Sequence, residues 1–347
     1  MNLAARLCLA LFASSTAAQP APPDYGFNFI TIGDVGNAAY DGPDVRGFVT
    51  GRGSVDYEYR IARTEVTKAQ FIEFLNGVLD AGIPLNLGAS PLYMGGTYRF
   101  STGRWEVLPG GEMLPVAGVA WRDAAVFMNW LHNGKVNTIE ALSSGAYDVS
   151  TWGDSPPYSD QTTHSPGAKY WIPSLDEWMK AAHYDPDKNG SGEGGWWLFN
   201  NSSDTQPVPG LPGVGETSAG LQIADIDAFG IPLESYPETQ TPWGLLDTSG
   251  GGSEWTESWY RLNGPDDHEL RLWQGNSAGT TSWDPSDSII QNEDLIWKFG
   301  SDRPNFPFGE TTFRVASLVP SPGVGAVGMT CGVFILTRRR RLSSDRA

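Results

Sequence analysis

Three segments of this chain have the pattern of an amphipathic helix, and long stretches rich in turn residues separate them. Two open with a capping box, in which a hydroxyl and the side chain three residues later satisfy the first backbone amides: Thr-Lys-Ala-Gln at 67–70 and Ser-Leu-Asp-Glu at 174–177. Apolar residues follow both at helical spacing, and again over 121–131. Strand-like segments at 27–32 and 55–61 lie among Gly, Asp and Pro turns. Helices and strands mixed without strict alternation predict an α+β fold.

The connecting stretches predict a single domain rich in irregular loops. The chain has 42 glycines and 25 prolines among its 347 residues. Residues 185–220 are especially rich in Gly, Pro, Ser and Asn, and we interpret them as a surface excursion because both flanks fit one pattern. No repeat of fixed period is present. The domain is predicted over residues 24–318.

Both ends of the chain have the composition of targeting segments. Residues 1–18 contain one arginine, an apolar run and then small residues, which predicts a secretory signal peptide. Residues 319–347 contain a pair of prolines, an uncharged apolar stretch and an arginine cluster, which predicts a membrane tail with its arginines in the cytoplasm. The apolar core, 323–337, is shorter than the roughly 20 residues of a spanning helix, so a buried terminal helix is the alternative.

The chain is strongly acidic. Its formal net charge is −17, and the two terminal segments hold arginines out of proportion to their length, so the domain between them is more negative still. Such a surface repels the phosphates of nucleic acids and anionic lipid head groups, and it suits divalent cations or neutral ligands. Acidity that only keeps an exported protein soluble is the alternative.

Thiol chemistry is excluded for the predicted domain. The chain has two cysteines, Cys8 and Cys331, and they fall in the signal peptide and in the tail. The residues between them therefore contain neither a disulfide nor a thiolate nucleophile, although the predicted export would permit disulfides.

A glycine-rich segment, 244–256, places two acidic residues around a run of glycines. Asp247 precedes Gly250, Gly251 and Gly252, and Glu254 follows them. Glycine lets the chain turn its carbonyl oxygens inward, so that these oxygens and the carboxylates can bind one hard cation. A solvated turn between two strands is the alternative.

Six segments, spread in order over about 260 residues, together match a set of motifs known from one protein family. They read VDYEYRIARTEVTKAQF at 55–71, PVAGVAWRDA at 115–124, YWIPSLDEWMKAA at 170–182, GLLDTSGGGSEWT at 244–256, RLWQGNS at 271–277 and FRV at 313–315. Together they resemble the motifs of the formylglycine-generating enzymes, the sulfatase-modifying factor family. The resemblance implies the compact, loop-rich variant of the C-type lectin fold that this family uses.

The resemblance fails at the residues that perform the family's oxidation. Members that convert a sulfatase cysteine to formylglycine carry two cysteines shortly after the fifth segment, and their thiolates hold a copper ion. Residues 275–284, Gly-Asn-Ser-Ala-Gly-Thr-Thr-Ser-Trp-Asp, contain no cysteine, and hydroxyls do not replace thiolates for the soft copper(I) ion. We therefore expect neither copper nor the oxidase reaction.

The family's calcium ligands are better matched, and calcium is the expected cofactor. At the first site the resemblance implies four oxygen ligands: the side chains of Asp247 and Glu254 and the carbonyls of Gly250 and Gly252. Gly251 and Ser253 replace an asparagine and a tryptophan of the family motif. A second site would use Asp225 and the carbonyl of Asp227.

The C-terminal segment carries a resemblance of its own. Val-Pro-Ser-Pro at 319–322 is followed by the apolar stretch and the arginine cluster. This arrangement resembles the PEP-CTERM sorting signal of bacterial exported proteins, in which the motif is Val-Pro-Glu-Pro. The resemblance implies an exosortase-type sorting enzyme as a partner, a transient anchor in the inner membrane, and delivery to the cell envelope or extracellular matrix.

The histidines and tryptophans are sorted by their sequence surroundings. The histidines have no metal-ligand spacing and are expected to be hydrogen-bonded surface or core residues: His132, His164, His183 and His268. Tryptophans within the fold motifs are expected in the core: Trp121, Trp178, Trp255 and Trp259. Others in loop-like surroundings are candidates for contact with a ligand: Trp196, Trp197 and Trp283.

Two classes of function follow from these features. The first is a non-catalytic, surface-anchored module, stabilised by calcium, that binds a peptide or carbohydrate outside the cell. The alternative is an enzyme that uses the same groove with residues other than cysteine. The sequence shows no convergent set of nucleophile, base and orienting residue, which favours the first class.

Overall fold

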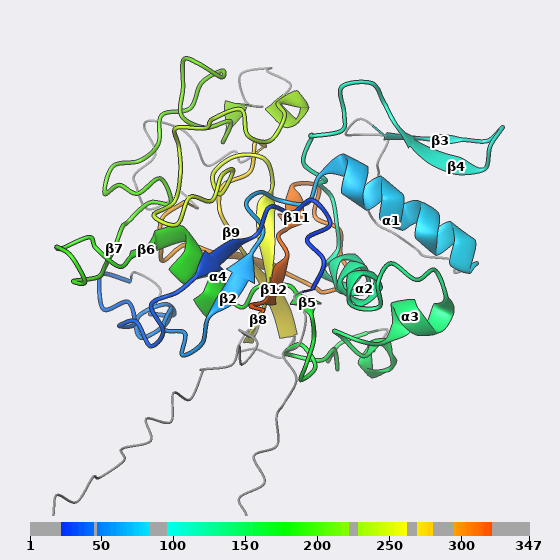
Figure 1. The fold of residues 1–347 in the computed structure, drawn as a ribbon, viewed down its shortest axis with the longest axis horizontal. Coiled ribbons are helices and arrows are strands. Elements are labelled where there is room, and N and C mark those ends of the chain that lie inside the picture. Colours follow the sequence, from blue (N-terminus) through cyan, green and yellow to red (C-terminus); the bar gives the residue numbers. More distant parts are fainter. Residues whose placement is uncertain are drawn as a thin grey trace, which may run out of the picture. The chain divides into compact units, whose positions relative to one another are not determined.

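A four-stranded antiparallel sheet brings the start and the end of the domain together. In the computed structural model its strand order is β1 (Ile30–Ile32), β2 (Tyr59–Ile61), β12 (Ala316–Leu318) and β5 (Tyr170–Trp171) (Figure 1). The last strand, β12, pairs with both β2 and β5. The sheet therefore depends on pairing between residues that lie far apart in the chain.

The structure describes residues 22–44, 47–82, 96–153, 155–221, 228–261, 269–279 and 294–320. The predicted signal peptide, the tail beyond residue 320, and four residues named above lie outside this part: Asp225, Asp227, His268 and Trp283. The described elements belong to one compact unit, Pro22–Val319. Within the described ranges, no helix is both long enough and apolar enough to cross a membrane.

Three helices confirm the prediction from the sequence: α1 (Lys68–Ala81), α2 (Trp121–His132) and α4 (Leu175–His183). The capping boxes at the starts of α1 and α4 are both formed, with each N-cap hydroxyl accepting from the backbone amide three residues later. Gly82 ends α1 in the left-handed conformation that glycine favours. A short helix that was not predicted, α3 (Ile139–Ser143), begins at the side-chain cap of Thr138.

A second, mixed sheet contains the strand on which the candidate site is built. Its order is β10 (Gly300–Asp302), β9 (Glu269–Gln274), β8 (Ser253–Arg261) and β11 (Thr311–Phe313). Strand β8 pairs antiparallel with β9 and parallel with β11. A break in the register interrupts the β8–β9 ladder between Trp255 and Trp259. This break, described below, positions an acidic side chain.

The predicted strands at 27–32 and 55–61 are too long, because β1 and β2 cover only their last three residues. In the first segment the Asp24 carboxylate accepts from the backbone amides of Gly26 and Asn28, each at 3.0 Å. Asn28 adopts a left-handed φ of 51°. A turn organised by an aspartate therefore replaces the first half of the expected strand.

The irregular stretch 185–220 is confirmed as mostly turns and bends. The remaining short elements are two-stranded ladders and 3-10 turns: β3 (Gly96–Arg99) with β4 (Arg104–Val107), β6 (Tyr184–Asp185) with β7 (Gly195–Trp196), η2 (Val149–Thr151) and η4 (Ala228–Gly230). The small antiparallel and mixed sheets, the few helices and the long connections make this a loop-rich α+β fold.

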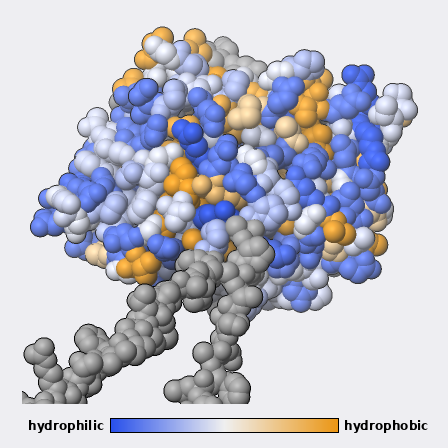
Figure 2. All heavy atoms as spheres, viewed as in Figure 1, coloured by the Kyte–Doolittle hydropathy of each residue, from blue (hydrophilic) through white to orange (hydrophobic). Residues whose placement is uncertain are grey.

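The main core is aromatic. Phe127 lies with its ring centroid 6.2, 5.3 and 5.2 Å from those of Phe71, Phe74 and Phe313. The tryptophans at 121, 178 and 255 are buried, as the sequence predicts. Each large apolar side chain that leaves water contributes about 1.5–3 kcal/mol, so such a core stabilises the described fold without disulfides. On the face shown in Figure 2, hydrophobic residues lie scattered among hydrophilic ones.

Candidate functional site

A cavity of about 530 Å³ lies where the start of α4 meets strand β8. Four separate parts of the chain line it, and we call it the Glu257 cavity. The lining residues are Phe48 and Arg52, Thr162 and Thr163, Ser174 and Asp176, and the β8 residues Glu257, Ser258, Trp259 and Tyr260.

A β-bulge in β8 places Glu257 at this cavity. The register with β9 breaks in mid-strand, so residues 256–258 leave the regular ladder. Polar groups of Glu257 and Ser258 bond the chain at the start of α4 instead. The Glu257 amide donates to the Pro173 carbonyl, and the Leu175 amide donates to Oγ of Ser258, each at 2.9 Å. The bulge therefore fastens β8 to α4 beside the cavity.

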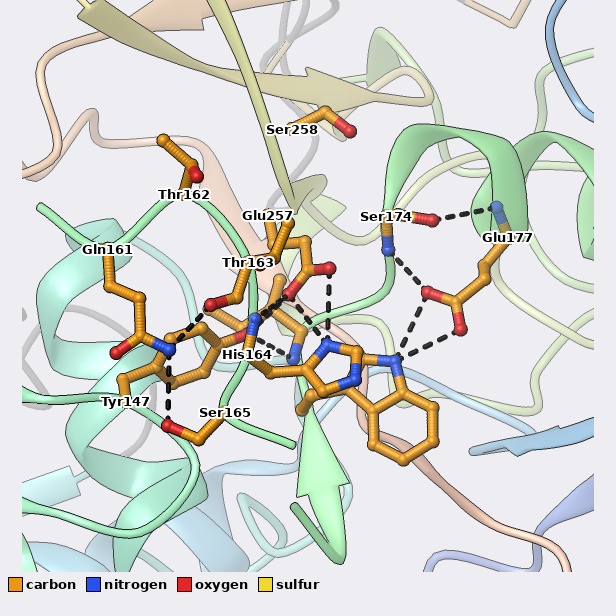
Figure 3. Close-up of polar contacts among 12 residues, drawn as sticks. Tyr147, Gln161, Thr162, Thr163, His164, Ser165, Ser174, Glu177, Glu257 and Ser258 are labelled. Carbon is orange, nitrogen blue, oxygen red and sulfur yellow. Dashed lines mark hydrogen bonds and ion pairs between the residues drawn. The ribbon is translucent and has the colours of Figure 1, made fainter. Parts of the chain in front are cut away.

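The Glu257 carboxylate is buried and accepts hydrogen bonds from two neighbouring residues. Its Oε2 atom accepts from the His164 amide at 2.9 Å, from His164 Nδ1 at 3.0 Å and from the Tyr147 hydroxyl at 3.1 Å (Figure 3). Arg271 fixes the backbone of the same residue, because its Nη1 donates to the Glu257 carbonyl at 2.6 Å. The carboxylate is thus held in one orientation.

His164 is held between Glu257 and a tryptophan. Because an ionised carboxylate only accepts hydrogen bonds, Nδ1 carries the proton of this bond and Nε2 is left as the basic nitrogen. The imidazole stacks on Trp171, with ring centroids 4.6 Å apart. Burial lowers the pKa of His164, but the hydrogen bond to Glu257 and the charges of Glu257 and Glu177 outweigh it, so the net shift is upward.

A second buried carboxylate, that of Glu177, accepts a hydrogen bond from the indole N–H of the same tryptophan. It accepts from Trp171 Nε1 at 3.1 Å and from the Tyr57 hydroxyl at 3.0 Å. Burial first, and then the charge of Glu257, raises the pKa of Glu177. The N–H of Trp171 therefore bonds one acid, Glu177, while the ring of Trp171 stacks on His164, which bonds the other acid, Glu257.

The outer walls of the Glu257 cavity are partly aromatic. Trp259 is 38% exposed and lines the cavity, so the prediction that it belongs to the core is wrong. In a regular strand, alternate residues face the same side, so Trp259 would be buried with Trp255; the bulge between them breaks this alternation. Phe48 and Tyr260 meet edge to face with centroids 5.4 Å apart. The remaining charged residues of the wall, Arg52 and Asp176, form an ion pair at 2.8 Å.

Of the predicted calcium ligands, Glu254 is bound to other groups of the protein. Its Oε1 accepts from Arg314 Nη2 at 2.7 Å, and its Oε2 accepts from Arg314 Nε and from Trp178 Nε1, each at 2.9 Å. The two side chains of the Glu254–Arg314 pair are 1% and 0% exposed. The pair is therefore a buried, bidentate ion pair at the start of β8.

The other predicted ligands lie in the loop that leads into this strand. Asp247 has a left-handed φ of 55°, and its carboxylate accepts from the Glu234 amide at 2.8 Å. Gly250 has a φ of 91°, which glycine adopts without strain. The Gly252 amide donates to Oε1 of Glu65 at 3.0 Å, which brings a further carboxylate to the loop.

Three carboxylates, those of Glu65, Asp247 and Glu254, lie at this loop and interact with one guanidinium, that of Arg314. Oε2 of Glu65 is buried and has no hydrogen-bond partner among the described residues. Burial, and then the charge of Glu254, raises the pKa of Glu65 well above its usual range, and burial raises the pKa of Asp247 to about 6. Such an excess of oxygen donors fits a hard cation. No group of three or more His, Cys, Asp or Glu side chains in the described ranges is arranged to hold a metal, so calcium binding stays a prediction.

The sequence profile described as "Sulfatase-modifying factor enzyme 1-like domain" matches residues 36–304. The chain belongs to this family. Among solved structures it is similar to CarF, with 20% identity over 85% of this chain and 99% of CarF and a TM-score of 0.49. It is also similar to Treponema denticola variable protein 1 (16% identity, 84% and 95% covered, TM-score 0.52) and to PvdO from Pseudomonas aeruginosa (17%, 84% and 91%, 0.44). The likeness to the Treponema protein shows the fold alone. No curated protein matches the chain.

Other side chains occupy the position at which the resemblance to the sulfatase-modifying factor family would place the copper cysteines. Ser277 donates through Oγ to Oε2 of Glu310 at 2.6 Å, and Ala278 and Gly279 follow. Residues 280–284 lie outside the described part. The sequence has no cysteine in this stretch, so the thiolates that a copper site requires are absent from it.

Sequence reasoning missed the residues that this member of the sulfatase-modifying factor family gathers around Glu257, of which only Glu257 itself lines the cavity. From the sequence, Glu177 is only the closing residue of a capping box, and His164 is only a histidine without ligand spacing. Glu257 follows Glu254 by three residues in the same strand, and this second acid was the one local signal. The bulge that turns it toward the cavity has no signature in the sequence.

Proposed function

We propose that this protein is a non-catalytic member of the sulfatase-modifying factor family that binds a neutral carbohydrate in the Glu257 cavity. The composition of the cavity walls carries the proposal: the rings of Phe48, Trp259 and Tyr260 lie in one lining with the side chains of Thr162 and Thr163. Sugars present apolar C–H faces that stack on aromatic rings, and hydroxyls that bond polar side chains. The volume of about 530 Å³ suits one or two sugar rings.

The charged groups of the cavity favour a neutral ligand over an ionic one. Asp176 is paired with Arg52, and Glu257 already accepts three hydrogen bonds. The charge of Asp176 is thus compensated by Arg52, and the carboxylate of Glu257 is stabilised by hydrogen bonds within the protein. Carboxylate oxygens in this state still have lone pairs that accept from a sugar hydroxyl.

Titration with neutral oligosaccharides, followed by calorimetry, tests the proposal. Trp259→Ala should weaken binding about tenfold, because losing one aromatic platform costs on the order of 1.4 kcal/mol. Phe100→Ala is the matched control, since Phe100 is 91% exposed and does not line the cavity. Affinities that are equal in wild type, Trp259→Ala and Phe100→Ala, or no binding of any oligosaccharide, would contradict the proposal.

His164 does not itself line the Glu257 cavity, but its bond to Glu257 supports a second candidate, a hydrolase that acts there. Its Nδ1 is held by Glu257 while Nε2 stays basic, which is the arrangement of an oriented general base. Among the described residues, however, no hydroxyl is hydrogen-bonded to Nε2 as a nucleophile would be. Formation of new reducing ends from a bound oligosaccharide, abolished by His164→Ala, would establish the hydrolase and exclude the non-catalytic module.

We also propose that the protein is exported, that calcium stabilises the loop of Asp247 and Glu254, and that the fold is the C-type lectin-like variant of its family. The support for export is the composition of residues 1–18, and an exosortase-type enzyme would sort the chain through residues 319–347. Cell fractionation compares the full-length chain with one that ends at Leu318. Equal solubility and release of the two would contradict the anchor.

A further inference from the structure

A second cavity, of about 600 Å³, is lined by the β6–β7 ladder and by residues 38–43. Three aromatic side chains contribute to its walls: Tyr40, Tyr184 and Trp196. The Trp196 ring meets that of Tyr40 at 82° with centroids 6.0 Å apart, and that of Tyr184 at 61° and 5.1 Å. Rings inclined in this way form walls of different orientation around one space. We call this space the Trp196 cavity.

Hydrogen bonds fix the polar end of each ring. Tyr40 and Trp196 donate to backbone carbonyls of residues 43 and 38, at 2.8 and 3.2 Å. Tyr184 donates to the Asp34 carboxylate at 2.6 Å. The polar groups of all three side chains are therefore satisfied by the protein. Tyr40 and Tyr184 are only 3% and 4% exposed, whereas Trp196 is half-buried, so the Trp196 ring offers the largest apolar surface of the three to a ligand.

Three glycines allow the backbone to approach the same rings closely. A Cβ atom at any of three positions would lie under 3.0 Å from one ring or its hydroxyl: at Gly42 against Tyr40, at Gly53 against Trp196, and at Gly194 against Tyr184. A side chain at these positions would displace the ring. The rings are thus held in place before a ligand arrives, which reduces the entropy lost on binding.

Acidic side chains outnumber basic ones in the lining of the Trp196 cavity, with Asp41 and Asp204 against Lys188. Asp204, which lines it, is paired with Lys188 at 3.2 Å, whereas the exposed carboxylate of Asp41 has no hydrogen-bond or ion-pair partner among the described residues. Burial, and then the charges of Asp44, Asp41 and Asp204, raises the pKa of Tyr40. Three carboxylates thus act on one ring of the cavity.

We propose that the Trp196 cavity binds an organic cation, an alkylammonium or guanidinium group, with its charge toward Asp41 and its carbon atoms against the ring of Trp196. The faces of aromatic rings attract such cations through their quadrupole, and a carboxylate adds a direct charge interaction. A neutral sugar would leave the Asp41 charge unused, and an inorganic ion would leave the rings without a contact. The site is separate from the Glu257 cavity and does not depend on the function proposed for it.

Choline and its uncharged isostere 3,3-dimethylbutan-1-ol test this site. The two have nearly the same shape and differ in charge, so any difference in affinity measures recognition of the cation. Choline should bind the full-length protein about tenfold more tightly than the alcohol, with quenching of tryptophan fluorescence and weaker binding at high salt. Equal affinities, or no binding of choline, would overturn the proposal.

Variants locate the binding. Asp41→Asn should weaken choline about fivefold and leave the alcohol unchanged, because it removes one exposed charge and no packing. Glu112→Gln, which changes an exposed acid outside the cavity, should bind choline as wild type does. Trp196→Leu should abolish the preference for choline, with thermal melting as the check that the variant folds. Wild-type affinity in Asp41→Asn, or the same loss in Glu112→Gln, would show that choline binds elsewhere.

Discussion

The Nδ1 atom of His164 lies 3.0 Å from Oε2 of Glu257, so one buried carboxylate sets both the tautomer and the charge of this histidine. The same oxygen accepts the His164 backbone amide, which fixes the distance between the two residues. When the imidazole is protonated, the hydrogen bond becomes an ion pair between partly buried groups. The upward shift of the His164 pKa follows from this geometry.

We expect Glu257→Gln to lower the pKa of His164, because the substitution removes the charge that favours the imidazolium. Since the folded-state pKa is raised, the pair stabilises the fold below the unfolded value of about 6.5, and this contribution is lost as the pH rises through the folded value. NMR titration of the imidazole C–H signals gives the pKa directly. Glu238→Gln, at an exposed position, is the control. An unchanged His164 titration in Glu257→Gln would show that Glu257 does not control it.

We expect Arg314→Met to be strongly destabilising at neutral pH. The guanidinium is fully buried and bonds Glu254, and it also acts on the charge of buried Glu65. Its removal leaves uncompensated carboxylates, which costs about 3–5 kcal/mol in the free energy of unfolding. Denaturant unfolding measures the loss. Arg303→Met changes an exposed arginine and should stay within about 0.5 kcal/mol of wild type. Equal losses in the two variants would show that the buried pair adds nothing to stability.

The helices could be predicted because their signals are local. Each capping box, Thr67 with Gln70 and Ser174 with Glu177, marks the start of its helix independently of contacts with distant residues. The strands depend on distant partners, as β12 does when it pairs with both β2 and β5, and a three-residue strand carries too little alternation to be bounded. The family motifs placed the chain in its family because they are spread over most of its length.

The candidate sites were only partly visible in the sequence. In a regular strand, Trp255 and Trp259 would lie on the same face. In the structure the bulge between them leaves the first buried and the second exposed. Trp196, predicted to contact a ligand, lines the second cavity. Trp197, predicted with it, instead donates from Nε1 to the Asp185 carboxylate at 3.1 Å. Such differences arise from tertiary contacts that composition and spacing do not encode.

Asp247 links the calcium prediction to pH. Burial raises the pKa of this carboxyl to about 6, above the value near 4 of an exposed aspartate. A group with a raised folded-state pKa stabilises the fold below its unfolded pKa, and that contribution is lost as the pH rises through about 6. In calcium-free buffer, the free energy of unfolding should therefore fall between about pH 4 and about pH 6.

Calcium should reverse this loss, because it binds the ionised carboxylate that is unfavourable without it. At a hundredfold excess over its Kd, a ligand of the folded state alone contributes about 2.7 kcal/mol, so the melting temperature at pH 7 should rise by several degrees over that in chelator. Asp247→Asn should show a weaker pH dependence and lose the response to calcium, whereas Asp56→Asn, at an exposed position, should behave as wild type does in both. Identical melting of wild type and Asp247→Asn, with and without calcium at pH 7, would mean that the loop binds no calcium.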